Sequence, residues 1–559
     1  MSAVRIFTKA SWSLLSTQAG ALAVIALATF LTRALPLSFS PYPFNNDGLI
    51  ESHLAANIID TGHLLTNSNG LTGTIHSEAI PILNVLAAFV AASLGVSPFF
   101  CAQVIVSLIS IVTVCGLFLL GRDFTGGRIG GMAASFPALF LGTFVFTTAS
   151  FWKEALGFAF MVLILLGFTR RNELRYRMLC FLLLMILPFV HHLVTAITLL
   201  AIAFPSAWGL YLALRDDTVR VRHLQDVLMI SLPLILTLSY YPWVSFDSFE
   251  GVSSPLSLLK MVAGFVILCA ISFGILRMRK HSKLTFAPIV GFGIVFVMLL
   301  DYSGYLFQYE SSVQIWYFVL VGGFAFLFTL AWYGTEIALE KNPVHRAVQL
   351  GLLLSPLALI GIGVSDGFSD VSHKLAYRTF DFVDIFMFLG CAIGVSFLFS
   401  RRKKVYFVIA SSVLVSSVAT FPFAYDSALL GVRHDSNAFE VDAIHWVSDS
   451  ARDPFVVTDE RLGYMVKALI GADEESSLPL LIMKNYTPKP GTLFILEDDW
   501  TMSGVNDFPR GLVVVPLSNF TTTLDAADVV YVGGPSNSRL IMAFGSTIGP
   551  YMYNRTPQL

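Results

Sequence analysis

The chain has 559 residues, of which 55% are hydrophobic and only 13% are charged, and its mean hydropathy is +0.72. A soluble protein carries about 25% charged residues, so this composition excludes a soluble globular protein and indicates a polytopic membrane protein. The formal net charge of −2 identifies no partner, and we expect none among nucleic acids.

Thirteen apolar runs have the length that a membrane-spanning helix needs, about 17–25 residues. A further run, Ala79–Gly95, is apolar but short, and we interpret it as a re-entrant or surface-lying helix. The sequence therefore predicts a polytopic α-helical membrane protein with about thirteen transmembrane helices. In chain order the runs lie at about 12–36, 98–120, 129–149, 153–169, 178–192, 193–214, 224–242, 257–276, 284–306, 312–333, 347–365, 379–400 and 405–424.

The distribution of Lys and Arg predicts the orientation of these helices. If the N-terminus is cytoplasmic, 21 of the 35 basic residues fall in cytoplasmic segments and nine lie in 425–559. Only five, among them Arg33 and Lys153, fall at outer ends and loops of the membrane part. Cytoplasmic loops are enriched in Lys and Arg, so this asymmetry supports both the helix count and the orientation. It predicts a transmembrane domain over 1–424, with an outer loop over 37–97, and an extracytoplasmic domain over 425–559.

The composition changes in the segment 425–559, where short β-rich runs alternate with helical stretches. This alternation predicts a small α/β domain. The β-rich runs are Phe455–Thr458, Thr492–Glu497, Gly511–Pro516 and Val529–Gly533, and the helical stretches are Ala438–Ser450 and Tyr464–Gly471.

The outer loop after the first apolar run carries two carboxylates, Asp47 and Glu51, and contains no Lys or Arg over Ser40–Leu64. Four residues apart, the two carboxylates would share one helix face. Asp47 is either a helix N-cap or a general base that takes a proton from an acceptor hydroxyl. Glu51 would orient the acceptor, help to hold a metal or simply be solvated.

Two further pairs lie on the predicted outer face. His76 and Glu78 precede the short apolar run, and they either face the same cavity as Asp47 or form the polar start of an interfacial helix. Lys153 and Glu154 lie between the third and fourth spans. They either pair with each other or snorkel to the interface, or Lys153 binds a phosphate and Glu154 completes an acidic site.

The remaining candidates are His191, His192 and Arg378. The two histidines lie at the outer hinge of the fifth and sixth spans, and adjacent positions on a helix would point them to different faces. One of them binds a phosphate or a sugar, or each is a satisfied interfacial histidine. Arg378 needs an anionic partner near membrane depth, either Asp381 or Asp384 or a lipid phosphate. We favour the phosphate, because most of the outer face is poor in cations.

With these residues in place, the chain resembles the GT-C membrane glycosyltransferases, which use polyprenyl-phosphate sugars. NNDGLIESHLAANIIDTGHL (45–64) is similar to the acidic first-loop motif of that family, and HSEAIPILNVLAAFVAASLG (76–95) to the start of its juxtamembrane helix. HHLVT (191–195) and AYRTFDF (376–382) resemble segments of its archaeal and bacterial members. The tail has no WWDYG motif, which argues against an oligosaccharyltransferase.

The resemblance implies a fold, an activity and a site. Asp47 matches the catalytic loop acid and would deprotonate an acceptor hydroxyl, which attacks the anomeric carbon with inversion. Arg378, with Lys153 or a histidine, would hold the phosphate of a polyprenyl-phosphate donor, and the acceptor would be a glycan, a lipid or a protein. No cofactor is predicted, and a divalent cation, Mg²⁺ or Mn²⁺, is an alternative that the pattern does not favour.

Two other classes of function remain open at this stage. A transporter or flippase of lipid-linked glycans would also show intramembrane charges and an outer phosphate site. A non-catalytic membrane assembly protein would use its outer domain to bind partners. No internal repeat of the kind that transporters carry is visible in the sequence, so we favour the transferase.

Overall fold

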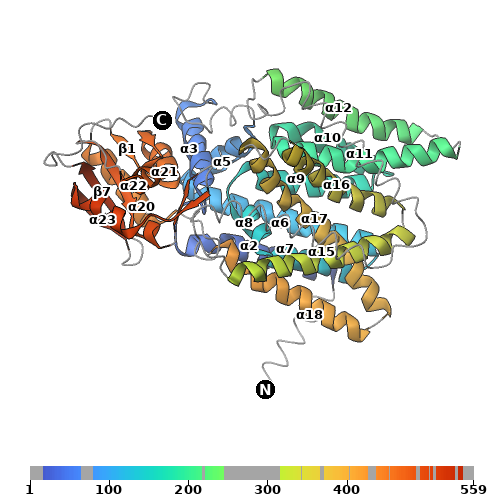
Figure 1. Cartoon of the computed structure of the whole chain (residues 1–559). Coiled ribbons are helices and arrows are strands. Elements are labelled where there is room, and N and C mark those ends of the chain that lie inside the picture. The colour runs from blue at the N-terminus through green and yellow to red at the C-terminus, as the bar shows by residue number, and fades with distance from the viewer. Residues whose placement is uncertain are drawn as a thin grey trace.

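The computed structural model describes residues 17–64, 80–216, 221–243, 315–341, 343–365, 370–401, 403–425, 436–451, 454–485, 491–502, 504–507, 511–534 and 539–545. Helices form the part before 425, and a sheet with helices around it forms the part after 436 (Figure 1). The two parts lie side by side.

Within the described residues, six helices are long and apolar enough to cross a membrane, or seven if the bent pair α7–α8 counts as one span. Helices occupy the predicted apolar runs in this part of the chain, and the runs at 257–276 and 284–306 lie outside it. The helices are α2 (Gln18–Ala34), α3 (Asn46–Thr61), α5 (Ile82–Leu94), α6 (Pro98–Thr125), α7 (Arg128–Phe140), α8 (Gly142–Ala149), α9 (Lys153–Thr169), α10 (Leu174–Ile186), α11 (His192–Arg215), α12 (Val221–Trp243), α15 (Ile315–Lys341), α16 (Pro343–Ser365), α17 (Asp370–Arg401) and α18 (Lys403–Thr420).

The run at 129–149 is not one continuous helix, and this differs from the sequence prediction. α7 and α8 meet at an angle of 73°, with Leu141 in an extended conformation between them. Pro137 weakens the end of α7, because its ring lacks an N–H and collides with the preceding turn. Gly142 allows a close approach at the bend, since a Cβ there would lie 2.1 Å from the carbonyl oxygen of Thr420.

The C-terminal part is built on a five-stranded mixed sheet in the order β2-β1-β3-β7-β6. β1 is parallel to β2 and β3, whereas β7 is antiparallel to β3 and β6. The elements are β1 (Phe455–Val457), β2 (Asp473–Glu475), β3 (Leu493–Glu497), β6 (Ala527–Gly533), β7 (Leu540–Gly545), the separate pair β4 (Val505–Asp507) and β5 (Gly511–Val513), and helices α20 (Ala438–Ser450), α21 (Glu460–Ile470), α22 (Leu478–Met483) and α23 (Leu517–Asp525).

The structure confirms the α/β character of this part and corrects its details. Strands occur in the predicted runs, although β5 is only three residues long, and α20 has the predicted bounds. The sequence pattern missed β7, which lies inside the sheet between β3 and β6. Most of β7 is buried on both faces, so its sequence is a continuous apolar run. It lacks the alternation of apolar and polar residues by which a half-exposed strand is recognised.

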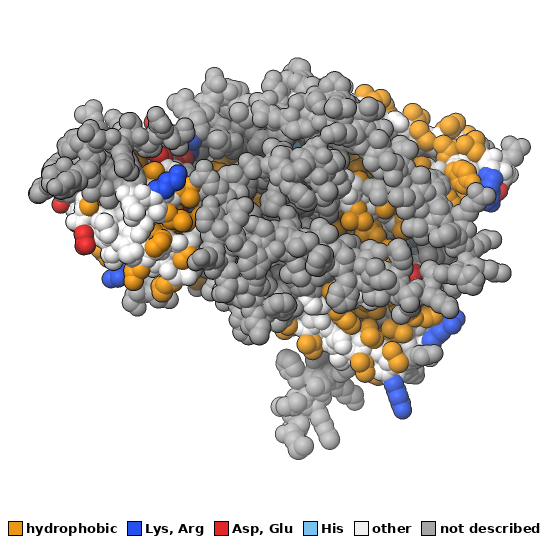
Figure 2. Space-filling model, in the orientation of Figure 1, with side chains coloured by type: hydrophobic (Ala, Val, Ile, Leu, Met, Phe, Trp, Pro, Cys, Tyr) orange, Lys and Arg blue, Asp and Glu red, His pale blue; other side chains and the backbone are white. Residues whose placement is uncertain are grey.

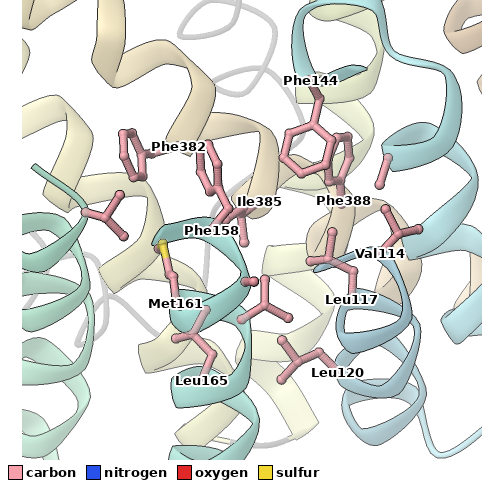
Figure 3. Packing of buried hydrophobic residues seen from close by; sticks show 14 of the residues in the cluster. Val114, Leu117, Leu120, Phe144, Phe158, Met161, Leu165, Phe382, Ile385 and Phe388 are labelled. Carbon is pink, nitrogen blue, oxygen red and sulfur yellow. The ribbon is translucent and has the colours of Figure 1, made fainter. Parts of the chain in front are cut away.

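Aromatic side chains from α8, α9 and α17 fill the core of the helical part (Figure 3). Phe144 of α8 packs edge-on against Phe388 of α17 with ring centroids 5.0 Å apart, and against Phe158 of α9 at 5.7 Å. All three side chains are fully buried. This contact anchors the short helix α8 beyond the bend.

The outer surfaces of α12 and α18 are apolar, as lipid contact requires. Phe407, Val408 and Val415 of α18 are each about two-thirds exposed, at 66%, 65% and 65%. Figure 2 shows hydrophobic side chains gathered over these peripheral helices, at the upper right and the bottom of the view. Together with the apolar spans, this surface makes the chain a membrane protein.

Helix α3 lies between the two parts (Figure 1). Leu49, Ile50 and Leu54 belong to the hydrophobic core of the C-terminal part, while Ala55 belongs to the core of the membrane helices. α5 packs beside α3 and exposes Phe89 on its other side. The predicted acidic loop is therefore a helix whose two faces belong to different parts of the molecule.

Candidate functional site

The acidic helix α3 begins at a defined cap. The side-chain oxygen of Asn45 accepts a hydrogen bond from the backbone N–H of Gly48 at 3.0 Å, so Asn45 is the N-cap. Asp47 lies in the first turn and is exposed, which corrects the alternative that Asp47 itself caps the helix. An acidic side chain at this position is favoured by the helix dipole.

Gly48 brings the start of α3 against the segment that follows α8. A Cβ on Gly48 would lie 2.7 Å from Cβ of Pro43, 2.9 Å from Oδ1 of Asn45 and 3.3 Å from Cβ of Phe151. No larger residue fits there without a shift of its neighbours. The next turn of α3 therefore faces Trp152 and Lys153.

At that contact, Glu51 pairs with Lys153. Nζ of Lys153 lies 3.0 Å from Oε1 of Glu51, and both side chains are largely buried, at 8% and 12% exposure. Asn84 of α5 donates from Nδ2 to the other carboxylate oxygen of Glu51 and, at 3.0 Å, to its backbone carbonyl. The structure thus brings together Glu51 and Lys153, and it adds Asn84, which sequence reasoning missed.

Lys153 and Glu154 form the first turn of α9, and both are buried. The sequence left open whether Lys153 pairs with Glu154 or binds a phosphate. The ion pair that the structure describes for Lys153 is with Glu51 of α3. Lys153 therefore sits at the positive end of a helix with a carboxylate beside it.

Asp381 and Asp384 of α17 contact the bent helix α8. Oγ1 of Thr147 donates to Oδ2 of Asp381 at 2.9 Å, and Oγ1 of Thr143 donates to Oδ2 of Asp384 at 3.3 Å. The two threonines were not among the predicted site residues. Their only signal in the sequence is the i,i+4 spacing of hydroxyls inside an apolar run.

Gln103 of α6 joins three segments at the end of the bundle that faces α3. Its Nε2 donates to the carbonyls of Arg33 and Ala149 at 2.8 and 3.0 Å, and its Oε1 accepts from the N–H of Phe44 at 3.1 Å. Gln103 is fully buried. One amide side chain therefore fixes the end of α2, the end of α8 and the approach to α3.

His191 and His192 lie at the start of α11, and their geometry corrects the sequence analysis. His191 is the N-cap, with Nδ1 accepting from the N–H of Val194 at 3.2 Å. Because His191 is outside the helix, the two rings stack, 4.8 Å apart and 15° from parallel, instead of pointing to different faces. Val194 approaches Gly157 of α9 closely, so the histidines lie at the same end of the bundle as Lys153.

Three of the predicted residues cannot be placed in this site from the described side chains. His76 and Glu78 lie outside the described residues, and Arg378 lies in α17 with its side chain outside them. His53 of α3 is half-buried, and burial lowers its pKa against the attraction of Asp60, so it is neutral at pH 7. Among the described side chains, no group of three or more His, Cys, Asp or Glu is placed to hold a metal ion.

No family model and no curated protein matches this chain. Solved structures do match. The oligosaccharyltransferase of Archaeoglobus fulgidus in the apo form has a TM-score of 0.52 at 13% identity, covering 96% of this chain and 74% of that one. The same protein in complex with Zn and sulfate gives 0.50 at 12%, covering 94% and 73%.

An arabinofuranosyltransferase from Mycobacteria also matches, with a TM-score of 0.47 at 13% identity over 95% of this chain and 40% of that one. At such identities the two archaeal structures establish a shared fold. The chain has the GT-C-like membrane fold that its sequence resemblance predicts.

Proposed function

We propose that this protein is a membrane glycosyltransferase that moves a sugar from a polyprenyl-phosphate donor to an acceptor on the outer face of the membrane, with inversion. The observation that carries the proposal is the position of α3 within a glycosyltransferase-like fold. Its exposed acidic first turn bears Asp47, and its next turn is joined to Lys153 at the start of α9 by the Glu51 ion pair.

Asp47 acts as the general base in this proposal. Its carboxylate takes the proton of an acceptor hydroxyl while the hydroxyl oxygen attacks the anomeric carbon. The bond from that carbon to the phosphate oxygen breaks, and the lipid phosphate leaves with the bonding electrons. The exposure of Asp47 supports the role, because an incoming acceptor can reach it.

Lys153 binds the donor phosphate in this proposal. It is the first residue of α9, where the helix dipole favours an anion. Glu51 holds the ammonium in place through one contact, and Asn84 fixes Glu51. Glu154, His191, His192 and Arg378 are proposed as further substrate-binding residues on the same face, with His76 and Glu78 on the loop before α5.

The proposed topology follows the sequence argument. The N-terminus is cytoplasmic, the transmembrane domain ends near 424, and the α/β domain from 425 onward lies outside the membrane, beside the outer loop over 37–97. The contact of α3 with the core of the α/β part supports this arrangement, because both must then lie on the same side.

The test uses purified protein and a panel of radiolabelled polyprenyl-phosphate sugars. We expect Asp47→Asn to reduce transfer by about 10²–10⁴-fold, because the base is lost. Asp60→Asn, an exposed acid near the other end of α3, is the matched control and should transfer at the wild-type rate. Transfer that survives Asp47→Asn rules out Asp47 as the base, and a wild type inactive with every donor rules out the transferase.

One observation favours a second candidate, a flippase of lipid-linked glycans. Helices broken within the membrane often build the binding sites of transporters, and the α7–α8 bend has Asp381 and Asp384 beside it. Reconstituted protein would then move a fluorescent lipid-linked sugar between leaflets without cleaving it. Cleavage in the same vesicles would favour the transferase.

A further inference from the structure

Arg33, in the last turn of α2, has a relative exposure of 0%. Its guanidinium donates to the carbonyls of Ala138 and Leu139 at 2.5 and 2.8 Å, and to Oγ1 of Thr148 at 3.1 Å. A fourth bond, at 2.9 Å, goes to Oγ1 of Thr32 in its own helix. All four acceptors are neutral oxygens. Burying a charge at membrane depth is costly, so these contacts must serve the structure around them.

The two carbonyls belong to the end of α7. In a continuous helix the oxygens of Ala138 and Leu139 would accept from the N–H groups of Gly142 and Thr143. The 73° bend removes those partners, and lipid offers no replacement. Arg33 supplies two donors and a positive charge at the negative end of the α7 dipole. Arg33 is thus the cap of α7.

The helix on the other side of the bend, α8, is fixed by contacts with α18, α17 and α9. The N–H of Gly142 donates to Oγ1 of Thr420 of α18 at 3.2 Å. Thr143 and Thr147 bind the aspartates of α17, as described above. Phe144 is fully buried in the core between α9 and α17. With α7 capped and these contacts made, the direction of α8 is fixed.

The segment from α8 to Lys153 has little freedom. The carbonyl of Thr147 accepts from Nε1 of Trp152 at 2.6 Å, and the carbonyl of Ala149 accepts from Gln103 at 3.0 Å. Lys153 begins α9 only four residues after Ala149. A change in the direction of α8 is therefore passed on to the position of the Lys153 ammonium.

We propose that Arg33 is a positioning residue of the transfer site, which sets the place of Lys153 by capping the bend between α7 and α8. The inference rests on the proposed function, in which Lys153 binds the donor phosphate. Arg33 itself does not contact the substrate.

The test measures binding of undecaprenyl phosphate and of undecaprenol to the detergent-solubilised full-length chain. Arg33→Lys keeps the charge but loses the planar fork that reaches both carbonyls and Thr148. We expect it to weaken binding of undecaprenyl phosphate about tenfold and to leave undecaprenol binding unchanged, because misplaced charges lose affinity steeply. Thr32→Val, which removes only contacts within α2, is the control and should bind both lipids as the wild type does.

The outcomes separate the two proposals. A wild type that binds the phosphate no more tightly than the alcohol contradicts the phosphate site and the proposed function. A wild type that prefers the phosphate, with Arg33→Lys showing the same preference, overturns the role of Arg33. If Arg33→Lys does not fold, Thr148→Val is the second variant. It removes one of the four bonds of Arg33, together with the bonds of the Thr148 hydroxyl to carbonyls of its own helix, and is expected to weaken phosphate binding about threefold. If Thr148→Val binds undecaprenyl phosphate as tightly as the wild type does, the inference is overturned.

Steady-state kinetics provide a second test of the role of Arg33 once an active donor is known. A misplaced Lys153 raises KM for the donor and leaves KM for the acceptor unchanged. A loss of folded protein alone lowers kcat per total protein and changes neither KM. Equal donor KM values for Arg33→Lys and the wild type would contradict a positioning role.

Discussion

At the scale of single residues, the buried carboxyl of Asp459 makes the stability of the C-terminal part depend on pH. Oδ1 of Asp459 accepts from the N–H of Leu462 at 2.6 Å and caps α21. Burial raises the pKa of its carboxyl to about 6, against the opposing attraction of Arg461. Arg461 in turn binds Glu440 through two bonds of 3.0 Å and Glu497 through one of 2.6 Å.

The raised pKa predicts a pH dependence. The folded state holds the proton of Asp459 more tightly than the unfolded chain, so its contribution to stability is full below about pH 4 and is lost as the pH rises through about 6. The contribution of Asp459 to the free energy of unfolding is lower at high pH than at low pH by about 3 kcal/mol. Asp459→Asn cannot ionise but keeps the cap, so it should slow hydrogen exchange in α21 at pH 7.5 and have little effect at pH 4.5.

Asp449→Asn is the control for that measurement, because Asp449 is exposed on α20. Comparing variants at each pH cancels the intrinsic pH dependence of exchange. A constant difference between Asp459→Asn and the wild type at all pH values would show that Asp459 does not titrate in this range.

At the scale of elements, α3 depends on the small size of Gly48. Gly48→Ala places a methyl group 2.7 Å from Cβ of Pro43 and 3.3 Å from Cβ of Phe151, so the helix must shift away from the start of α9. We expect a loss of about 1–3 kcal/mol of stability. Transfer should fall at least tenfold, because the Glu51–Lys153 pair is stretched. Thermal unfolding and the transfer assay measure the two effects.

Gly209→Ala is the matched control. Gly209 is also helical, and a Cβ there meets nothing within 4 Å. This variant should unfold no earlier than the wild type and should transfer normally. If Gly48→Ala behaves in the same way, the approach of α3 to Phe151 does not matter for the site.

At the scale of the whole molecule, α3 joins the membrane helices to the α/β part. Leu49 is fully buried in the core of the α/β part, although it precedes that part by nearly the whole transmembrane region. Leu49→Ala should cost about 2–5 kcal/mol at this contact. Limited proteolysis should then release the C-terminal part faster than from the wild type.

Ile59→Ala, on the exposed side of the same helix at 40% exposure, should leave the proteolysis rate unchanged. Equal rates for Leu49→Ala and Ile59→Ala would contradict a shared core. If the prediction holds, the α/β part and the acidic helix move as one body.

The sequence by itself determined the membrane helices and the class of fold. Apolar length is a local property, and a spanning helix satisfies its own backbone groups, so a run such as 98–120 needs no distant partner to be recognised. The acidic helix and the bounds of α20 were likewise predictable, since caps and periodicity involve neighbouring residues.

The tertiary structure alone decided how the acidic helix and the bend are built into a site. The pairing of Glu51 with Lys153, and of Arg33 with the end of α7, joins residues about a hundred positions apart. The sequence placed Arg33 simply among the outer basic residues, whereas the structure buries it. Such contacts depend on which helices pack together, and no local pattern records that choice. For Asp47, the sequence singled out the residue and predicted its side of the membrane, and the fold supplied its neighbours.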